Sequence, residues 1–413
     1  MPNTQSGPKQ GRWTPRFIVL VALALGTFAK LWLAGTSIGS NDLPLFKGFA
    51  RLLETHGLVE LYRNSTIFNH TPLISAYTVG AHWIAGDSTQ SFAFVFRLGG
   101  IVADAAVVFG LLRMVRLGVQ IPTWALALFA ASPVSIMVSG FHGNVDPMLA
   151  AALFFTALAL REKRWIAAGF ALALACNIKV SALLIAPAFG AWVLARDRAA
   201  TVRFTVSAVL FTVAGWAWPL IACPDAFARN VLGYGGYWGI WGITQLLRAT
   251  GNPDFAKISY VGLSAAQTSV IQVLKLIIIG SALGVAWFRR RQDLFSTVGA
   301  VWLVFFVFAP GAAAQYLVWP APFLLLLSAR GYAAVTVGCG IFLAAFYTVL
   351  CNGWPWVLGV STAANTPRWL PWTYAAWLPC VAWLAVWSVG SFRKKSVPLS
   401  EPAPASGAIA SNA

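Results

Sequence analysis

The feature that most constrains this chain is a series of long apolar segments separated by short polar ones. Twelve runs approach the length of a bilayer-spanning helix, which needs about 20 apolar residues. Within a bilayer the backbone polar groups must bond inside the chain, so helices are expected. The sequence therefore predicts an all-α polytopic membrane bundle of about twelve spans (eleven to thirteen). The predicted spans are 17–36, 92–112, 121–139, 147–161, 165–176, 178–195, 203–222, 266–288, 293–309, 317–329, 331–351 and 372–391.

Composition excludes most other classes of protein. Hydrophobic residues make up 59% and charged residues 10% of the 413 positions, whereas a soluble domain carries about 25% charged residues. A soluble, disordered or fibrous chain is therefore excluded. The net charge of +17 does not indicate a nucleic-acid partner, because most basic residues sit in short clusters between apolar runs. The five cysteines form no CxxC pair and are expected to be small buried apolar residues.

The placement of lysine and arginine predicts the topology. With twelve spans, every basic cluster falls on one side, together with both termini, and that side is expected to be the cytoplasm. This scheme requires segment 73–86 to be an interfacial or re-entrant helix rather than a span. The clusters hold 18 of the 29 basic residues and are Lys9/Arg12/Arg16, Arg113/Arg116, Arg161/Lys163/Arg164, Arg196/Arg198/Arg203, Arg289/Arg290/Arg291, Arg330 and Arg393/Lys394/Lys395.

The same scheme predicts three regions along the chain. We expect a cytoplasmic tail over 1–16, a membrane domain over 17–391 and a disordered cytoplasmic tail over 392–413. Three longer loops fall on the extracytoplasmic face and carry charges of both signs, so chemistry is expected there. These loops are 37–72, 223–265 and 352–371.

Asp42 opens the first of these loops, in the segment SNDLPLF directly after the first span. At the membrane surface, partial desolvation is expected to raise its pKa and make it a better base. Two other roles suit the same position. A loop aspartate is often simply solvated, or it caps a helix, and Pro44 fits the first turn of one.

The rest of the loop predicts an amphipathic helix in the membrane interface. Phe46, Phe49 and Leu52 fall at helical spacing beside Lys47 and Arg51. Such a helix would anchor the loop to the bilayer or lay a basic side chain beside a phosphate, and the sequence leaves both open.

A polar break, SGFHGNVDPM, follows on the same predicted face. Asp146 followed by Pro147 predicts a capped helix start. His142 and Asn144 are not needed for capping, and polar side chains at membrane depth usually face a cavity.

Arg97, Asp104 and Lys179 are charged residues that lie inside apolar segments. Lys179, in NIKVSALLIAP, either needs an anion or a water-filled cavity, or lies at a helix–helix turn and snorkels to the interface. Arg97 and Asp104 are seven residues apart, share a helix face and are expected to pair with other polar groups of the bundle.

Aromatic and amide side chains occur near the predicted interfaces. Gln315 and Tyr316 precede a short apolar run. Four tryptophan pairs are expected to form aromatic belts, with sugar stacking as a second use. Because no GxSxG, P-loop or HExxH signature occurs, neither a nucleotide nor a zinc site is indicated. No cofactor is expected, and a divalent metal is not indicated but is left open. The tryptophan pairs are Trp216/Trp218, Trp238/Trp241, Trp354/Trp356 and Trp369/Trp372.

Taken in order, these motifs resemble a known family. SNDLPLF opens the first loop and FNHTPLI closes it, and FHGNVDP, CNIKVSALLIAP and QYLVWPAPFLL follow, with YGGYWGIWGITQLLR in the loop 223–265. From about residue 17 to 330 the chain resembles the multispanning glycosyltransferases of the C-type (GT-C) fold. It is similar to the polyprenyl-phosphate-sugar-dependent mannosyl- and glucosyltransferases.

The resemblance implies the inverting transfer of a sugar, with mannose as the first expectation, from a polyprenyl phosphate to an acceptor hydroxyl. The active site would be extracytoplasmic, in a bacterial plasma membrane, with Asp42 as the general base. The partners would be the lipid-linked sugar, a lipid or glycan acceptor and membrane lipids. The residues implied to bind the leaving phosphate are Arg51, Arg63, His70 and Lys179. Those implied to contact the substrates are Asn41, Asn69, His142, Asn144, Asp146, Gln315 and Tyr316.

One alternative function remains open at this point. A polytopic transporter or lipid flippase without chemistry would also place Arg97, Asp104 and Lys179 inside apolar segments. It would predict that lipid or solute crosses the membrane while the sugar donor stays intact.

Overall fold

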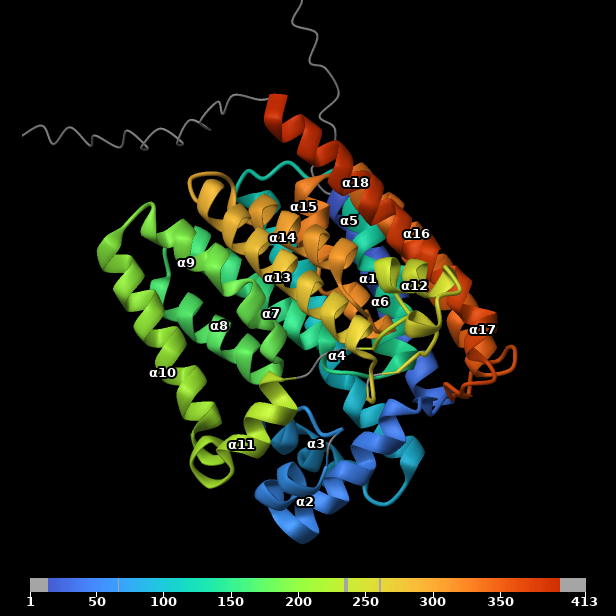
Figure 1. The fold of residues 1–413 in the computed structure, drawn as a ribbon. Helices are drawn as coiled ribbons and strands as arrows, with labels where there is room; N and C mark the ends of the chain where they lie inside the picture. The colour runs from blue at the N-terminus through green and yellow to red at the C-terminus, as the bar shows by residue number, and fades with distance from the viewer. Residues whose placement is uncertain (1–13, 66, 234–236, 260, 394–413) are drawn as a thin grey trace, which may run out of the picture.

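The computed structural model describes residues 14–65, 67–233, 237–259 and 261–393, which form an almost entirely helical bundle (Figure 1). The only strands in these ranges are β1 (Gly39–Ser40) and β2 (Leu358–Gly359), which pair in parallel. The predicted all-α polytopic fold is confirmed. Most of the predicted tails, including Lys9, Arg12, Lys394 and Lys395, lies outside the described residues.

Seven apolar helical segments in the described ranges are long enough to cross a bilayer, by length and composition. At about 1.5 Å per residue, about 20 helical residues cover the hydrocarbon core of about 30 Å. Two of the seven are runs of consecutive shorter helices. The seven are α1 (Thr14–Thr36), α4 (Thr89–Arg116), α5 (Thr123–Ala130) with α6 (Pro133–Ser135) and η1 (Ile136–His142), α10 (Arg198–Ala222), α13 (Ala265–Phe288), α16 (Ala329–Leu350), and α17 (Thr366–Trp369) with η6 (Leu370–Trp372) and α18 (Thr373–Arg393).

The other five predicted spans coincide with shorter helices. Among them α7 and α14 are buried on most sides, which explains why their sequences are apolar all round. That each of these helices crosses the membrane stays a prediction. The five are α7 (Asp146–Arg161), α8 (Trp165–Ile178), η2 (Val180–Leu184) with α9 (Ala186–Leu194), α14 (Leu294–Phe308), and η5 (Ala314–Val318) with α15 (Ala321–Leu327).

The remaining helices belong to the predicted loops and to segment 73–86. Figure 1 shows α2, α3 and α11 together at one end of the bundle, beyond the spanning helices. α3 covers the ambiguous segment, packs against α2 and is about 21 Å long, as an interfacial helix would be. These helices are α2 (Asp42–Asn64), α3 (Pro72–Ala85), α11 (Pro224–Phe227), η3 (Ala228–Leu232), α12 (Gly242–Ala249) and η4 (Pro253–Phe255).

The apolar face of α2 packs on the protein, so its predicted role as a lipid-facing anchor is wrong for the first half of the helix. Phe46 is 3% exposed, and its ring centroid lies 4.6 Å from that of Phe96 in α4. The buried ammonium of Lys47 donates to the backbone oxygen of Asp87 and, at 3.1 Å, to Thr89 Oγ1. Lys47 therefore joins α2 to the start of α4 and is not available to a phosphate.

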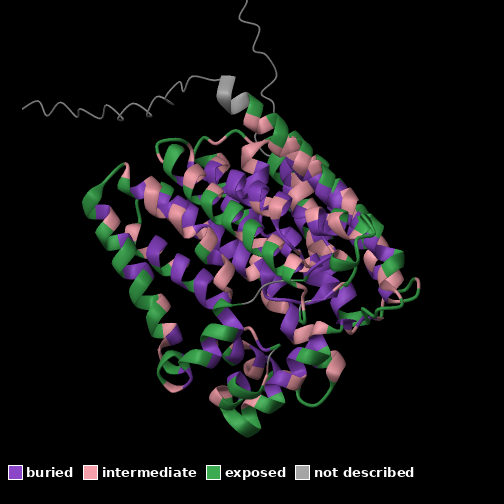
Figure 2. Cartoon of the chain, viewed as in Figure 1, coloured by how far each residue is buried: buried purple, intermediate pink, exposed green. Residues whose placement is uncertain are grey.

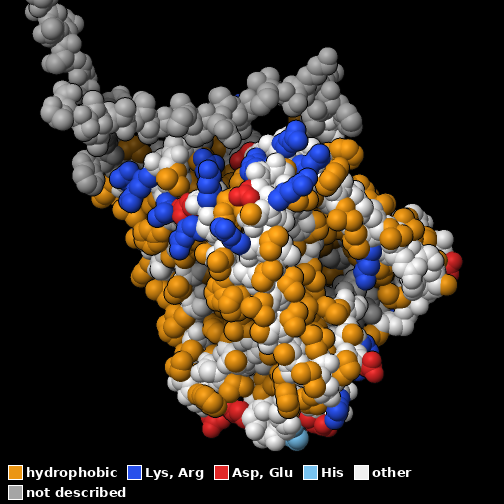
Figure 3. Space-filling view, turned by 90° about the vertical axis from the view of Figure 1, so that its left-hand side faces the viewer, with side chains coloured by type: hydrophobic (Ala, Val, Ile, Leu, Met, Phe, Trp, Pro, Cys, Tyr) orange, Lys and Arg blue, Asp and Glu red, His pale blue; other side chains and the backbone are white. Residues whose placement is uncertain are grey.

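The predicted basic clusters that fall between Arg113 and Arg330 gather at the end of the bundle opposite α2. Figure 3 shows lysine and arginine side chains concentrated at this end on the face in view. Ion pairs and hydrogen bonds tie the helix ends together there. Arg113 Nε lies 2.5 Å from Glu162 Oε1, and Arg196 donates to the backbone oxygen of Arg290 at 2.8 Å. The shared placement is confirmed for the clusters between Arg113 and Arg330, whereas the side of the membrane that they face stays a prediction.

Burial separates a protein core from a lipid-facing surface. Buried residues fill the centre of the bundle, while α10, α13 and α18 expose apolar side chains along their outer faces (Figure 2). Trp238 and Trp241 belong to the core and not to an aromatic belt, because both are buried and donate through Nε1 to Phe255 O at 3.1 Å and Phe306 O at 2.8 Å. So broad an apolar surface indicates an integral membrane protein.

Candidate active site

A short backbone pairing fixes the start of α2. β1 lies between α1 and α2 and pairs with β2, so the first long loop is held against the last one. The Asn41 N–H donates to Gly359 O at 2.9 Å, and Ser40 Oγ donates to His142 O at 2.8 Å. Asp42 is the first residue of α2, and its carboxylate bonds to groups outside the helix. The interpretation of Asp42 as a helix cap is therefore wrong.

The second half of the site is the turn between η1 and α7. The π-helix η1 ends at His142, and Gly143 follows with φ 74°, a left-handed conformation that favours glycine. A Cβ atom at Gly143 would lie 2.5 Å from Leu43 Cδ1. The first turn of α2 therefore packs directly on this glycine, and the close approach brings Asp42 beside His142 and Asn144.

The Asp42 carboxylate is held by one oxygen and free at the other. Oδ2 lies 3.1 Å from His142 Nε2 and 3.0 Å from Asn144 Nδ2. Oδ1 has no hydrogen-bond partner in the described part of the chain, and the side chain is 30% exposed. An oriented carboxylate with one accessible oxygen is the arrangement that a general base needs.

Tyr347, from α16, extends this chain of polar groups. Its hydroxyl lies 2.9 Å from His142 Nδ1. When the hydroxyl donates, Nδ1 accepts, and Nε2 carries the ring proton toward Asp42. Tyr347 thereby orients the histidine that orients the carboxylate. The sequence did not single it out, because a lone tyrosine near the end of an apolar span has no local pattern to mark it.

The surroundings lower the pKa of Asp42, opposite to the predicted direction. Burial by itself raises this pKa, but the hydrogen bond and charge of His142 and the hydrogen bond of Asn144 outweigh it and bring the pKa below the ordinary 3.8. The prediction of a raised pKa is wrong because it counted desolvation and missed partners more than ninety positions away in the chain. Asp42 is therefore ionised at neutral pH.

The same turn holds a buried ion pair. Asp146 Oδ1 accepts from Lys179 Nζ at 2.8 Å and from Trp319 Nε1 at 2.6 Å. The ammonium also lies over the Tyr316 ring, 4.3 Å from its centroid. The N-cap of α7 is Val145, so the predicted capping role of Asp146 is wrong. Lys179 has an anion as its partner, as the first of its two interpretations requires, and this anion is a carboxylate of the protein itself.

Asn144 and Asp146 bring Asp42 and Lys179 into one site. Residues two positions apart have Cα atoms at most about 7 Å from each other. Asn144 bonds to Asp42 and Asp146 bonds to Lys179, so a single turn carries the partners of both charged groups. His70 also belongs here, because its ring interacts electrostatically with Lys179 and with Asp42.

His70 carries no charge at neutral pH. Its burial, and after it the positive charge of Lys179, lower the pKa of His70 to about 3, and the negative charge of Asp42 offsets only part of this. The ring could donate a hydrogen bond to a phosphate but would bring no positive charge. Its role as a phosphate ligand stays a prediction.

Arg51 and Arg63 do not lie beside Asp42. Arg51 follows Asp42 by two and a half helical turns, on the opposite side of α2, and its guanidinium is 3.0 Å from Asp87 Oδ1. Arg63 follows the kink of α2 and donates to the backbone oxygen of Ala222, at the end of α10, at 3.1 Å. Their roles as phosphate ligands stay predictions, and neither has support from proximity.

The other predicted substrate contacts vary in accessibility. Asn41 is exposed, and Asn69 and Gln315 are half-buried. Tyr316 is buried and stacks on Trp319, with ring centroids 4.1 Å apart. Trp319, which the sequence did not single out among twenty tryptophans, thus links the Gln315–Tyr316 segment to Asp146.

Arg97 and Asp104 find partners within the bundle, as predicted. The Arg97 guanidinium donates to several groups between α1 and η1, among them Gly140 O at 3.1 Å. Asp104 Oδ2 accepts from Lys30 Nζ at 2.7 Å and from Ser135 Oγ at 2.6 Å. These groups join spanning helices to each other.

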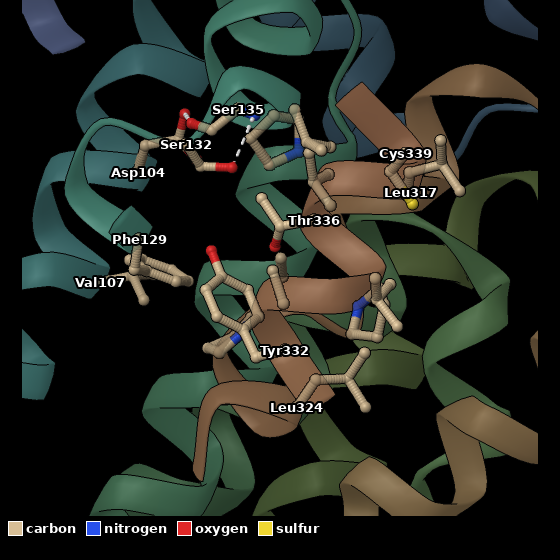
Figure 4. Close-up of a pocket in the computed structure, with 18 residues that line it drawn as sticks. Asp104, Val107, Phe129, Ser132, Ser135, Leu317, Leu324, Tyr332, Thr336 and Cys339 are labelled. Carbon is tan, nitrogen blue, oxygen red and sulfur yellow. Dashed lines mark hydrogen bonds between the residues drawn. The ribbon is translucent and has the colours of Figure 1, made fainter. Parts of the chain in front are cut away.

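A small cavity lies beside Asp104, away from Asp42. Figure 4 shows Ser132, Tyr332 and Thr336 around it, at the junction of α4, the α5–α6 turn and α16. Its volume of about 30 Å³ holds about one water molecule. The cavity is too small for a sugar, so it is a feature of the bundle interior and not a substrate site.

The cysteines behave as expected, since all five are free thiols and four of them are buried. Over the described ranges, no group of three or more histidine, cysteine, aspartate or glutamate side chains is placed to hold a metal ion. The expectation that the protein uses no cofactor stays a prediction.

The fold and this site define an integral membrane protein with a cluster of charged and hydrogen-bonded side chains toward one end of the bundle. The model of glycosyltransferase family 87 matches residues 82–310, more than half of the chain. The chain therefore belongs to glycosyltransferase family 87, a family of multispanning membrane glycosyltransferases of the GT-C type. A comparison with curated proteins found no match. The matched range contains the η1–α7 turn and Lys179, whereas Asp42 and His70 precede it.

Proposed function

We propose that this glycosyltransferase moves a sugar from a polyprenyl phosphate to an acceptor hydroxyl, with Asp42 as the general base. The observation that carries the proposal is the Asp42 carboxylate, fixed through Oδ2 and open at Oδ1. Such an oxygen can take the proton of a hydroxyl that approaches from the open side. The proposed donor is based on the sequence motifs that resemble polyprenyl-phosphate-sugar-dependent enzymes. The same motifs favour mannose as the sugar.

The proposed reaction is a single displacement. The acceptor oxygen attacks the anomeric carbon as Asp42 Oδ1 takes its proton, and the bond from that carbon to the phosphate oxygen breaks. The lipid phosphate leaves with the bonding electrons, so the configuration at the anomeric carbon inverts. A weakly basic, always ionised carboxylate suits this step, because the hydroxyl becomes acidic only as the new bond forms.

The leaving phosphate needs hydrogen-bond donors more than a free cation. Lys179 has three N–H donors, of which one bonds to Asp146, so it can also donate to a phosphate without losing its partner. His70 can add a neutral donor. The ion pair with Asp146 would hold Lys179 in place for this contact.

The first test of the function uses purified protein with radiolabelled donors. Transfer is expected from a polyprenyl-phosphate sugar and not from a nucleotide-diphosphate sugar, because the chain has no nucleotide-binding signature. Proton NMR of the product should show the anomeric configuration opposite to that of the donor. Transfer from the nucleotide sugar alone would refute the donor class, and a retained configuration would refute the single displacement.

The site is proposed to face away from the cytoplasm, because it lies at the end of the bundle opposite the basic clusters. In a Cys351→Ser background, which removes the one half-buried thiol, His56→Cys should react with a membrane-impermeant reagent added from outside. Lys163→Cys, at the basic end, should stay protected in intact cells. The reverse pattern of labelling would invert the topology.

The pH dependence follows from the lowered pKa of Asp42. Protonation removes the base, so the rate falls only as pH approaches the pKa, which lies below 3.8. We expect the rate to show no Asp42-linked loss between about pH 5 and 7. His142→Ala removes a partner that lowers the pKa, so its acid limb should move to higher pH. The assignment of Asp42 as the base would be contradicted if the acid limb of the wild-type pH–rate profile were centred near pH 6 and did not move in His142→Ala.

The transporter alternative has lost the observation that motivated it. Arg97, Asp104 and Lys179 all bond within the bundle and therefore need no transported ion. No second function is proposed.

A further inference from the structure

α13 carries a polar stripe that neither the fold nor the proposed reaction uses. Thr268, Gln272 and Lys275 are four and three residues apart, which places them on one face of this spanning helix. Thr268 and Gln272 are exposed and Lys275 is half-buried. The nearby Leu276 and Ile279 are 70% and 52% exposed, so this side of α13 faces the lipid and not the bundle interior.

Lys275 differs from the other cations in the middle of the spans. Lys30 is 2.7 Å from Asp104 and Lys179 is 2.8 Å from Asp146, while the terminal nitrogens of Arg97 donate to several backbone oxygens. Lys275 makes no hydrogen bond or ion pair with any residue in the described ranges. An ammonium inside a membrane span is costly unless an anion or water accompanies it. No anion of the described chain accompanies Lys275, so an anion from outside this part of the chain would lower the cost.

The depth of Lys275 limits which anion it can meet. A capping box of Ser264 and Gln267 fixes the start of α13 at Ala265. Lys275 follows about 15 Å along the helix. Its side chain points back toward the helix N-terminus and can snorkel in the same direction. The ammonium thus reaches toward the headgroup layer at the end of the bundle that holds α2, where lipid phosphates are the abundant anions.

We propose that Lys275, together with Gln272 about one turn nearer the start of the helix, binds the phosphate of a membrane lipid on the outer face of α13. The ammonium pairs with the phosphate, and the Gln272 amide donates a hydrogen bond to it. Bulk phospholipids and polyprenyl phosphates both carry this group. The inference concerns binding and does not depend on the transfer reaction.

The test measures lipid binding by native mass spectrometry on the purified full chain after delipidation. The lipids are phosphatidylglycerol with diacylglycerol as its phosphate-free counterpart, and a polyprenyl phosphate with the corresponding polyprenol. The wild type should bind at least one phosphate lipid more tightly than its counterpart. Lys275→Gln should weaken that binding about tenfold or more, the loss expected for one charged hydrogen bond, and Lys275→Arg should retain it.

The matched control is Lys257→Gln, which removes the same charge from the exposed loop before α13 and should bind like the wild type. The experiment measures lipid binding and not sugar transfer, so a negative result would leave the proposed role of Asp42 untouched. Tight binding of the polyprenyl phosphate alone would identify a polyprenyl lipid as the occupant, and equal binding of phosphatidylglycerol would identify bulk lipid. Undiminished binding in a folded Lys275→Gln protein, or no preference for phosphate in the wild type, would overturn the proposal.

Discussion

Asp42→Asn is expected to lower kcat for sugar transfer by about 10²- to 10⁴-fold, the usual contribution of a general base. The amide oxygen of asparagine can still accept from His142 and Asn144, so the fold around the site should remain. The substitution removes only the ability to take a proton. The measurement is transfer from a labelled lipid-linked sugar under single-turnover conditions, together with gel filtration to show that the variant is folded.

A matched control is available on the same helix. Glu54 of α2 has a side chain 28% exposed, close to the 30% of Asp42, and it lies 3.6 Å from a histidine, His82. Glu54→Gln should transfer sugar at nearly the wild-type rate. Full activity of a folded Asp42→Asn protein would remove Asp42 from the reaction, and equal losses in both variants would indicate a general effect of charge on α2.

Breaking the Asp146–Lys179 pair is expected to destabilise the protein by about 3–5 kcal/mol for either single substitution, because a buried charge is left without its partner. The Asp146 side chain is fully buried and that of Lys179 is 15% exposed. Lys179→Met should cost more than Asp146→Asn, since the amide of asparagine can still accept from Trp319. The double variant, Asp146→Asn with Lys179→Met, should recover much of the loss. Thermal unfolding followed by tryptophan fluorescence measures all three.

The comparison pair for this cycle is Arg51–Asp87, whose side chains are 55% and 92% exposed. Exposed pairs contribute about 0–1 kcal/mol, so Arg51→Gln should leave the unfolding temperature almost unchanged. If Lys179→Met were as stable as the wild type while transfer was lost, Lys179 would act mainly on the substrate and not as a structural partner of Asp146.

The fold was predictable because its main signal is local. A run of about 20 apolar residues specifies a helix in lipid whatever its neighbours are. The helices α1, α4, α10, α13 and α16 therefore appear where the apolar runs predicted them. The clustering of Arg113, Arg196 and Arg290 at one end was predictable for the same reason, since basic residues that flank apolar runs can be located in the sequence alone.

Side-chain partners across the bundle were not predictable from spacing. Both residues that the sequence placed at helix starts, Asp42 and Asp146, have bonds across the bundle in place of caps. The apolar stripe of α2 predicted a helix that faces lipid. The prediction failed because the stripe has the same pattern whether the helix packs on lipid or on protein. Only the position of Phe96 on α4 decides between the two.

By itself, the sequence determined a helical membrane bundle in which the basic helix ends lie together. It also placed Asp42, the turn that contains His142 and the turn that contains Lys179 at the opposite end. Only the tertiary structure decided that Asp42 meets His142 and Asn144, that Tyr347 orients this histidine, and that Asp146 neutralises Lys179. The physical reason is that the energy of a charged group depends on the atoms within a few ångströms of it. In this bundle, the partners of Asp42 lie a hundred residues or more away along the chain, and the carboxylate partner of Lys179 lies more than thirty residues away.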